Sequence, residues 1–156
     1  MRALVQRVQA GSVTVAGECL GRIGAGLVVL VGIQAGDTEA EATWLAQKVA
    51  NLRIFDDDQG RFDRSLLDVG GGALVVSQFT LYGDARRGRR PSFSSAAPPE
   101  EAAPLVARFA TLLTEQGVAP VEQGRFGAHM VVSIENDGPV TLWLDTDIAR
   151  SGAAKE

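Results

Sequence analysis

The sequence predicts one α+β domain in which about two helices pack against a largely antiparallel β framework. Three observations predict this class. A glycine-bounded apolar run at 26–32 is typical of a buried strand, two segments carry apolar residues at helical spacing, and short strand-like segments lie near both ends of the chain. Because 156 residues suffice for one hydrophobic core, we expect the domain to span residues 1–150, followed by a C-terminal tail at 151–156.

The N-terminal part of the chain predicts three strands. Residues 3–9 and 12–16 are short segments rich in valine, and Gly17 and Gly21 mark a hairpin. The run 26–32 shows no alternation of polar and apolar residues. We therefore expect it to form a strand that is buried on both faces.

The first helix is predicted to begin after Thr38. Thr38 and Glu41 match a capping box, in which each side chain accepts a hydrogen bond from the other residue's backbone N–H. Leu45, Val49 and Leu52 then fall on one face of the helix. We expect this face to pack on the sheet.

An acidic turn follows the first helix. The segment Arg53-Ile54-Phe55 leaves the helix and enters Asp56-Asp57-Asp58-Gln59-Gly60. Three adjacent carboxylates can bind a metal, but they lack the regular ligand spacing of a calcium loop. We therefore interpret the segment as a solvated loop and expect no metal site.

The second half predicts a buried strand from Ala73 to Tyr82 and then a loop at 83–99. Pro98 and Pro99 stand where proline favours the start of a helix. The buried face of this second helix is predicted to contain Leu105, Phe109 and Leu112, and Gly117 ends it. Further strands are predicted at 118–122, 129–136 and 140–145.

The composition excludes several kinds of site. The chain has one cysteine, Cys19, and one histidine, His129, which are too few for an internal disulfide or a Cys/His zinc site. A Ser-His-Asp triad requires His129 as its base. With a net charge of −4, contact with nucleic acid must come from a local patch. We expect no cofactor, no membrane span and a cytoplasmic location.

Polar residues appear abruptly at the end of the apolar stretch 73–76, in the segment Ser77-Gln78-Phe79-Thr80. Strand ends are common places for functional groups, because the scaffold holds them rigidly. In a regular strand Ser77 and Thr80 point to opposite faces, so they cannot act on one atom together. The alternative interpretation is a strand end whose hydroxyl groups bond to the backbone.

The segment Asn136-Asp137-Gly138-Pro139 lies between two predicted strands. Its residue types favour a hairpin turn, since glycine supplies unusual φ values and proline fixes its own. The pattern alone therefore predicts an ordinary turn, and a cis bond before proline is uncommon.

The predicted loop 83–99 contains four arginines in one stretch of five residues, namely Arg86, Arg87, Arg89 and Arg90. Arginine can donate two parallel hydrogen bonds to a phosphate, so an RNA backbone is a natural partner for this cluster. The alternative is a solvated, mobile loop.

Together these segments resemble the D-aminoacyl-tRNA deacylase family of the bacterial and eukaryotic type. The resemblance runs nearly end to end. It comprises Arg2-Ala3-Leu4-Val5-Gln6-Arg7-Val8, Asn51-Leu52-Arg53-Ile54-Phe55, Ser77-Gln78-Phe79-Thr80-Leu81-Tyr82, Arg89-Arg90-Pro91-Ser92-Phe93-Ser94, Gly124-Arg125-Phe126 and Asn136-Asp137-Gly138-Pro139-Val140-Thr141. Each segment alone is a weak signal, whereas their order over a chain of this length is highly specific.

The resemblance implies a homodimer with its active sites at the interface. It implies a cis bond between Gly138 and Pro139, whose backbone carbonyls reach into the partner's pocket and exclude the side chain of an L-amino acid. Arg7 fixes this loop, and Phe126 and Met130 belong to the substrate-binding residues. The implied substrates are D-aminoacyl-tRNA and tRNA-Ala mischarged with glycine. The second follows because glycine has no side chain to exclude.

The candidate catalytic residues are Ser77, Gln78, Phe79 and Thr80, and two schemes remain open. Thr80 is one candidate nucleophile, yet no base that could activate it is evident. In the scheme we prefer, backbone N–H groups near Phe79 and Thr80 stabilise the developing oxyanion. The 2′-hydroxyl of the terminal adenosine positions or activates water, and the resemblance favours this RNA-assisted scheme.

His129 is a departure from the resemblance, because an acidic residue is common in this family at its place. A lone histidine is more typical of a structural or surface position, but a pocket position could alter amine binding or pH dependence. Two other functions stay open. One is a non-catalytic RNA-binding module that uses the loop 86–90, and the other is an esterase for small D-amino acid esters.

Overall fold

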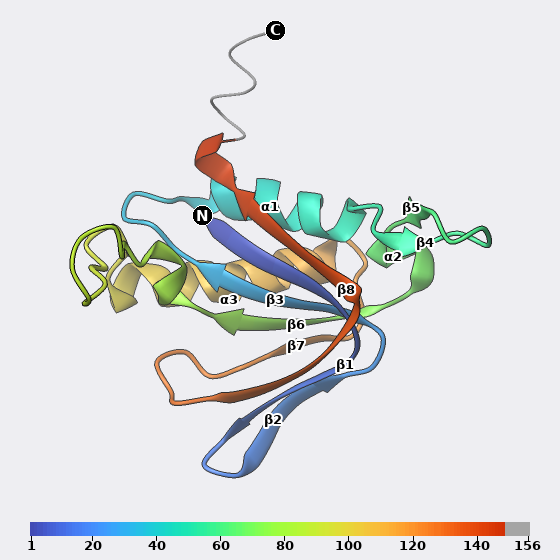
Figure 1. Cartoon of the computed structure of the whole chain (residues 1–156), viewed down its shortest axis with the longest axis horizontal. Helices are drawn as coiled ribbons and strands as arrows, with labels where there is room; N and C mark the ends of the chain where they lie inside the picture. The colour runs from blue at the N-terminus through green and yellow to red at the C-terminus, as the bar shows by residue number, and fades with distance from the viewer. Residues whose placement is uncertain (149–156) are drawn as a thin grey trace, which may run out of the picture.

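The computed structural model describes residues 1–148, so the tail expected at 151–156 lies outside the described residues. The strands are β1 (Arg2–Val15), β2 (Glu18–Ile23), β3 (Gly26–Gly32), β4 (Phe55–Asp56), β5 (Phe62–Arg64), β6 (Gly72–Ser77), β7 (Val121–Gln123) and β8 (Val131–Asp145). The helices are α1 (Glu39–Asn51), α2 (Leu66–Val69), the 3-10 helix η1 (Phe79–Tyr82) and α3 (Pro99–Glu115). One curved main sheet carries α1 and α3 on one side (Figure 1).

The main sheet has the strand order β2-β1-β3-β6-β7, with β8 paired to β1 as well. The prediction of one compact sheet-based domain is confirmed. The pairings of β1 are antiparallel, but β3–β6 and β6–β7 are parallel, so the sheet is mixed. Helices lie between these strands in the chain, and a helical crossover allows parallel pairing. The prediction of about two helices gave α1 and α3 and omitted the short α2 and η1.

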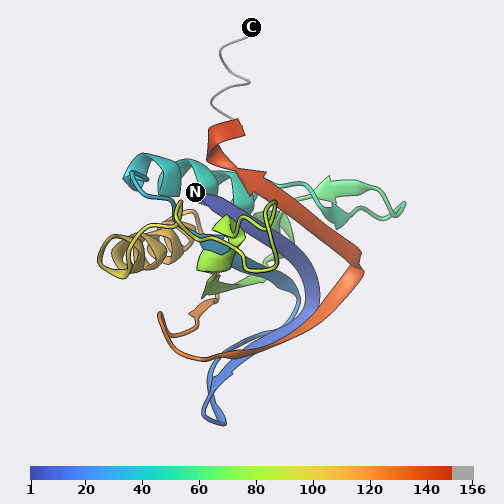
Figure 2. The same cartoon turned by 60° about the vertical axis from the view of Figure 1, so that its left-hand side comes forward.

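Strand β1 is one element of 14 residues, so the predicted division at 3–9 and 12–16 is wrong. Its register against β8 shifts between Gln6 and Ala10, and both long strands bend together (Figure 2). The hairpin with β2 is confirmed. Ala16 and Gly17 have positive φ values at its turn, as a tight hairpin requires, while Gly21 lies within β2.

The core lies on both sides of β3, which confirms the prediction of a strand buried on two faces. On one side Val29 belongs to a cluster with Leu45 of α1 and Phe109 of α3. On the other side Val28 belongs to a second cluster with Leu74 of β6. Strand β6 is buried in the same way, with Val75 in the first cluster and Leu74 in the second. The ends of β3 and β6 therefore form a rigid support for a site.

Both long helices begin as predicted. The N–H of Thr38 donates to the Glu41 carboxylate at 2.6 Å, and Pro99 starts α3. Ser65 and Asp68 form a second capping box at α2. No helix within residues 1–148 is long and apolar enough to cross a membrane.

Strand β8 is one element of 15 residues, which corrects the prediction of two strands at 129–136 and 140–145 joined by a turn. Both halves pair with β1, since Val132 lies opposite Val13 and Leu142 lies opposite Val5. The chain therefore does not reverse at residues 136–139. These residues form a bulge, where one strand carries extra residues relative to its partner.

Candidate active site

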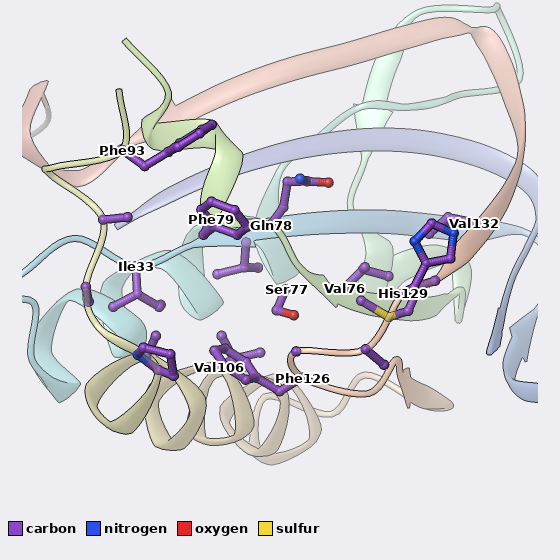
Figure 3. A pocket seen from close by; sticks show the side chains of 18 residues that line it. Ile33, Val76, Ser77, Gln78, Phe79, Phe93, Val106, Phe126, His129 and Val132 are labelled. Atoms are coloured by element: carbon purple, nitrogen blue, oxygen red, sulfur yellow. The ribbon is translucent and has the colours of Figure 1, made fainter. Parts of the chain in front are cut away.

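A cavity of about 600 Å³ opens at the carboxyl ends of the parallel strands β3 and β6. Its volume lies in the range usual for small-molecule sites. The walls come from these strand ends, η1, the loop before α3, the first turns of α3 and the segment before β8 (Figure 3). The lining residues include no Asp, Glu, Lys or Arg, and His129 is the ionisable side chain among them.

Strand β6 ends at Ser77, so the predicted strand from Ala73 to Tyr82 is wrong in its second half. Its neighbour β3 ends at Gly32, and beyond this point no strand accepts further ladder bonds from β6. The chain instead closes 3-10 bonds, with the N–H of Leu81 donating to the Gln78 carbonyl at 3.2 Å. The alternation of faces assumed for residues 77–80 therefore does not apply.

The start of η1 leaves backbone donors free beside the cavity. The first N–H groups of a helix have no acceptor within the helix. Among residues 1–148, the N–H groups of Phe79 and Thr80 donate no hydrogen bond. Because Phe79 lines the cavity, its free amide is a candidate donor for a ligand oxygen, and the free amide of Thr80 follows it in the first turn of η1.

The side chains of residues 77–80 differ in placement. Ser77, Gln78 and Phe79 line the cavity, while Thr80 does not. Gln78 Nε2 donates to the Thr80 hydroxyl, and an amide cannot act as a base. The Phe79 ring is 57% exposed and stands edge-on to Phe93, with centroids 5.0 Å apart.

The segment before β8 supplies a further wall with Phe126 and His129 (Figure 3), and its Met130 also lines the cavity. It is attached to β6, because the N–H of Gly124 donates to the Val75 carbonyl at 3.0 Å. A Cβ at Gly124 would stand 2.6 Å from the Met130 sulfur, so the glycine permits close packing. His129 is exposed at this wall.

Gly138 and Pro139 are exposed and do not line the cavity of their own chain. Their peptide bond is cis, and Gly138 has a φ of 117°. Asn136 spans the bulge from inside, since its Nδ2 donates to the Arg7 carbonyl at 3.0 Å and to the Val140 carbonyl at 3.1 Å. These bonds replace ladder bonds that the bulge interrupts.

Arg7 is 6% exposed and contacts the same bulge. Its Nε donates to the Asp137 carbonyl at 3.3 Å and lies 3.2 Å from the Asp137 carboxylate. The structure thus brings Arg7, Gly138 and Pro139 together, at a place separate from residues 77–80.

The arginine cluster lies on an exposed loop whose base is closed by two backbone bonds between Asp84 and Ser92. Arg86 pairs with Asp84 at 2.6 Å, and this hydrogen bond holds the pKa of the Asp84 carboxyl well below its usual range. Within the described chain, Arg87, Arg89 and Arg90 form no ion pair. Their guanidinium groups are therefore available to an anionic partner.

The acidic turn distributes its carboxylates among three arginines. Asp56 pairs with Arg7, Asp57 with Arg61 and Asp58 with Arg64. The backbone N–H of Arg61 also lowers the pKa of the Asp57 carboxyl. These pairings agree with the interpretation of a solvated turn and give Asp56 a link to the bulge.

Sequence reasoning missed the cavity wall formed by Phe93 and the start of α3. Pro99, Ala102 and Val106 line the cavity, but small apolar residues at the start of a helix are indistinguishable from core residues in a sequence. Phe93 was detectable, because it is a large aromatic residue within a polar, arginine-rich loop.

The fold and the site define an α+β protein with a ligand cavity and free amide donors at the start of the 3-10 helix beside it, an arrangement typical of acyl-transfer enzymes. A family model described as D-Tyr-tRNA(Tyr) deacylase matches residues 4–145. The chain belongs to this family.

Relatives and solved structures agree with this membership. The chain is 65% identical to the D-aminoacyl-tRNA deacylase of Roseiflexus castenholzii over 150 residues, which cover 96% of this chain and 95% of the relative. It is 61% identical to that of Thermomicrobium roseum, covering 98% and 99%. A solved structure titled c-Myc DNA Unwinding Element Binding Protein has a TM-score of 0.86 at 42% identity, covering 93% and 98%. A probable eukaryotic D-amino acid tRNA deacylase has a TM-score of 0.80 at 20% identity, covering 92% and 98%, and supports the fold alone.

Proposed function

We propose that this chain hydrolyses the ester bond between a D-amino acid and the 3′ end of tRNA. The observation that carries the proposal is the start of η1, where the amides of Phe79, which lines the cavity, and of the next residue, Thr80, donate no hydrogen bond. Hydrolysis of an ester passes through a tetrahedral intermediate whose oxyanion needs such donors. Relatives of 65% and 61% identity bear the name D-aminoacyl-tRNA deacylase, and an enzyme acting on tRNA is expected in the cytoplasm.

The site favours catalysis by the backbone over catalysis by the Thr80 hydroxyl. A hydroxyl nucleophile needs a neighbouring base, and the described partner of this hydroxyl is the amide of Gln78. In the proposed scheme water attacks the ester carbonyl, the two amides bind the developing oxyanion, and the 2′-hydroxyl of the terminal adenosine positions or activates the water. The tetrahedral intermediate then collapses, the bond to the 3′ oxygen of the adenosine breaks, and this oxygen takes up the proton released by the water as the free amino acid leaves. Ser77, Phe126 and Met130 shape the cavity around the aminoacyl end.

Chiral selection is assigned to Gly138 and Pro139 of a partner subunit. This dipeptide is exposed and lies outside the cavity of its own chain, so it is free to enter the cavity of a second copy. Within the described chain β8 pairs only with β1, and its exposed residues include Val131 and Trp143. Such a long open edge favours association. Glycyl-tRNA is a second proposed substrate, because it offers no side chain to exclude.

The loop carrying Arg86, Arg87, Arg89 and Arg90 is proposed to bind the tRNA backbone. It lies next to the cavity, since Phe93 in the same connection lines that cavity. Guanidinium groups without internal partners suit phosphate binding. The net charge of −4 makes this local patch the main electrostatic attraction for RNA.

Matched D- and L-aminoacyl-tRNA test the proposed function directly. We expect hydrolysis of the D form to exceed that of the L form by at least about 100-fold, because a rigid wall discriminates more strongly than an apolar pocket does. Equal rates on both would defeat the chiral claim. Salt-sensitive RNA binding without turnover would instead support the non-catalytic module. Equal rates on free D-amino acid esters and on charged tRNA would support the small-molecule esterase.

Thr80→Ala is expected to retain most of the single-turnover rate, with a loss of no more than about tenfold. The substitution removes the hydroxyl and its bond to Gln78, but it keeps the backbone N–H that the scheme uses. The measurement is single-turnover hydrolysis of D-aminoacyl-tRNA, with tRNA binding and far-UV circular dichroism as controls. Near-complete loss of hydrolysis by a folded, tRNA-binding variant would make Thr80 the nucleophile.

A further inference from the structure

Arg7 connects the bulge of β8 to a second, distant segment of the chain. Its Nη1 donates to the Ile54 carbonyl at 2.8 Å and to the Asp56 carboxylate at 3.2 Å. Its guanidinium also lies 5.6 Å from the centre of the Phe62 ring. Ile54, Asp56 and Phe62 all belong to the β4–β5 hairpin or its entry. The hairpin thus holds one side of the guanidinium while Asp137 holds the other.

The Arg7 guanidinium pairs with two carboxylates at once. The Arg7 side chain is 8% exposed and lies between the Asp56 and Asp137 carboxylates, which are 44% and 37% exposed. A largely buried cation needs opposite charge and hydrogen-bond acceptors to hold its position. With Asn at position 56, Arg7 keeps its bond to the Ile54 carbonyl, but its remaining carboxylate partner is Asp137 on the bulge, so the charge attraction on the guanidinium is directed toward Asp137.

The Arg7 guanidinium lies close to the backbone of Gly138, so the position of one constrains the position of the other. A Cβ built on Gly138 would lie 3.1 Å from Arg7 Nη2, so the guanidinium packs directly against the glycine backbone. A displacement of this group therefore displaces the bulge. At selective sites a change of about 1 Å in position can alter rates by about 100-fold.

We propose that Asp56 is a positioning residue for stereochemical selection, acting through Arg7 on Gly138 and Pro139. Phe62 assists by covering the guanidinium. The proposal rests on the proposed function, because it assigns the β4–β5 hairpin a part in holding the dipeptide that excludes L-amino acids. The hairpin is otherwise an exposed element without contact to the cavity.

Asp56→Asn tests the proposal, with Asp58→Asn as a matched control. Asp58 lies on the same turn and pairs with Arg64 at 2.7 Å, and its side chain is 91% exposed. The measured quantity is kcat/KM on D-aminoacyl-tRNA divided by kcat/KM on L-aminoacyl-tRNA. We expect Asp56→Asn to lower this ratio roughly tenfold, chiefly through a higher rate on the L form. The control is expected to keep the wild-type ratio.

Other outcomes overturn the proposal. An unchanged ratio, or an equal fall in both variants, shows that Asp56 does not act through Arg7. A parallel loss of rate on both substrates together with a lower melting temperature shows a merely structural role. If Asp56→Asn does not fold, Phe62→Leu serves as the second variant, and an unchanged ratio there is equally contradictory. Equal wild-type rates on D and L substrates would contradict the proposed function itself.

Discussion

Phe79→Pro is expected to hydrolyse D-aminoacyl-tRNA about 100- to 1,000-fold more slowly than Phe79→Ala, the loss typical of removing one oxyanion donor. Both variants lose the ring and its contact with Phe93. Proline alone also lacks the backbone N–H. The ratio of the two single-turnover rates therefore measures the contribution of one amide, independently of the side chain.

The local backbone suits this comparison. Phe79 is the first residue of η1, a position where proline is well tolerated. Gln78 before it has φ −145° and ψ 78°, outside the helical region that a following proline disfavours. Circular dichroism and tRNA binding control for folding. Equal rates for the two folded variants would exclude the Phe79 amide from catalysis and leave the Thr80 hydroxyl to be reconsidered.

The catalytic segment shows what sequence patterns can and cannot predict. The abrupt change from apolar to polar residues at Ser77 coincides with the end of β6, although the predicted strand continued to Tyr82. The pattern predicted a strand that ends at Gly32, but it could not show that this strand pairs with β6 and so sets where β6 loses its partner. That end makes residues 79–82 close into a 3-10 helix and leaves their first amides free. Long-range pairing, rather than local propensity, creates the proposed oxyanion site.

The bulge at residues 136–139 illustrates the same limit. Asn, Asp, Gly and Pro predict a turn from local preferences. In the fold, both flanking halves pair with β1, and the side chain of Asn136 bridges the interrupted ladder. The elements with strong local signals, such as the capping box of α1 and the run 26–32, were predicted correctly.

Gly138→Ala is expected to lower the preference for D- over L-aminoacyl-tRNA by about 100-fold. Gly138 has φ +117°, where residues with a side chain are strained. The added Cβ would stand 2.8 Å from Val140 Cγ2 and 3.1 Å from Arg7 Nη2. Both neighbours are packed, so the bulge must move. The measurement is the ratio of kcat/KM on the two substrates.

Gly36→Ala is the matched control for this substitution. Gly36 also has a positive φ, +89°, but nothing lies within 4 Å of an added Cβ. It therefore reports the cost of backbone strain without a steric clash. We expect Gly36→Ala to lower stability while keeping the wild-type ratio. A Gly138→Ala variant that also keeps the ratio would remove this glycine from stereochemical selection.

Mixed dimers decide whether the bulge acts on its own subunit or on the partner. In a dimer of one Phe79→Pro subunit and one Gly138→Ala subunit, the intact cavity belongs to the Gly138→Ala subunit. If Gly138 acts across the interface, that cavity receives the intact glycine of its partner, and selective hydrolysis returns at one of the two sites. If it acts within its own subunit, the mixed dimer hydrolyses D and L forms with the poor selectivity of Gly138→Ala. Differently tagged subunits allow the mixed species to be isolated, and each parent variant alone supplies the baseline.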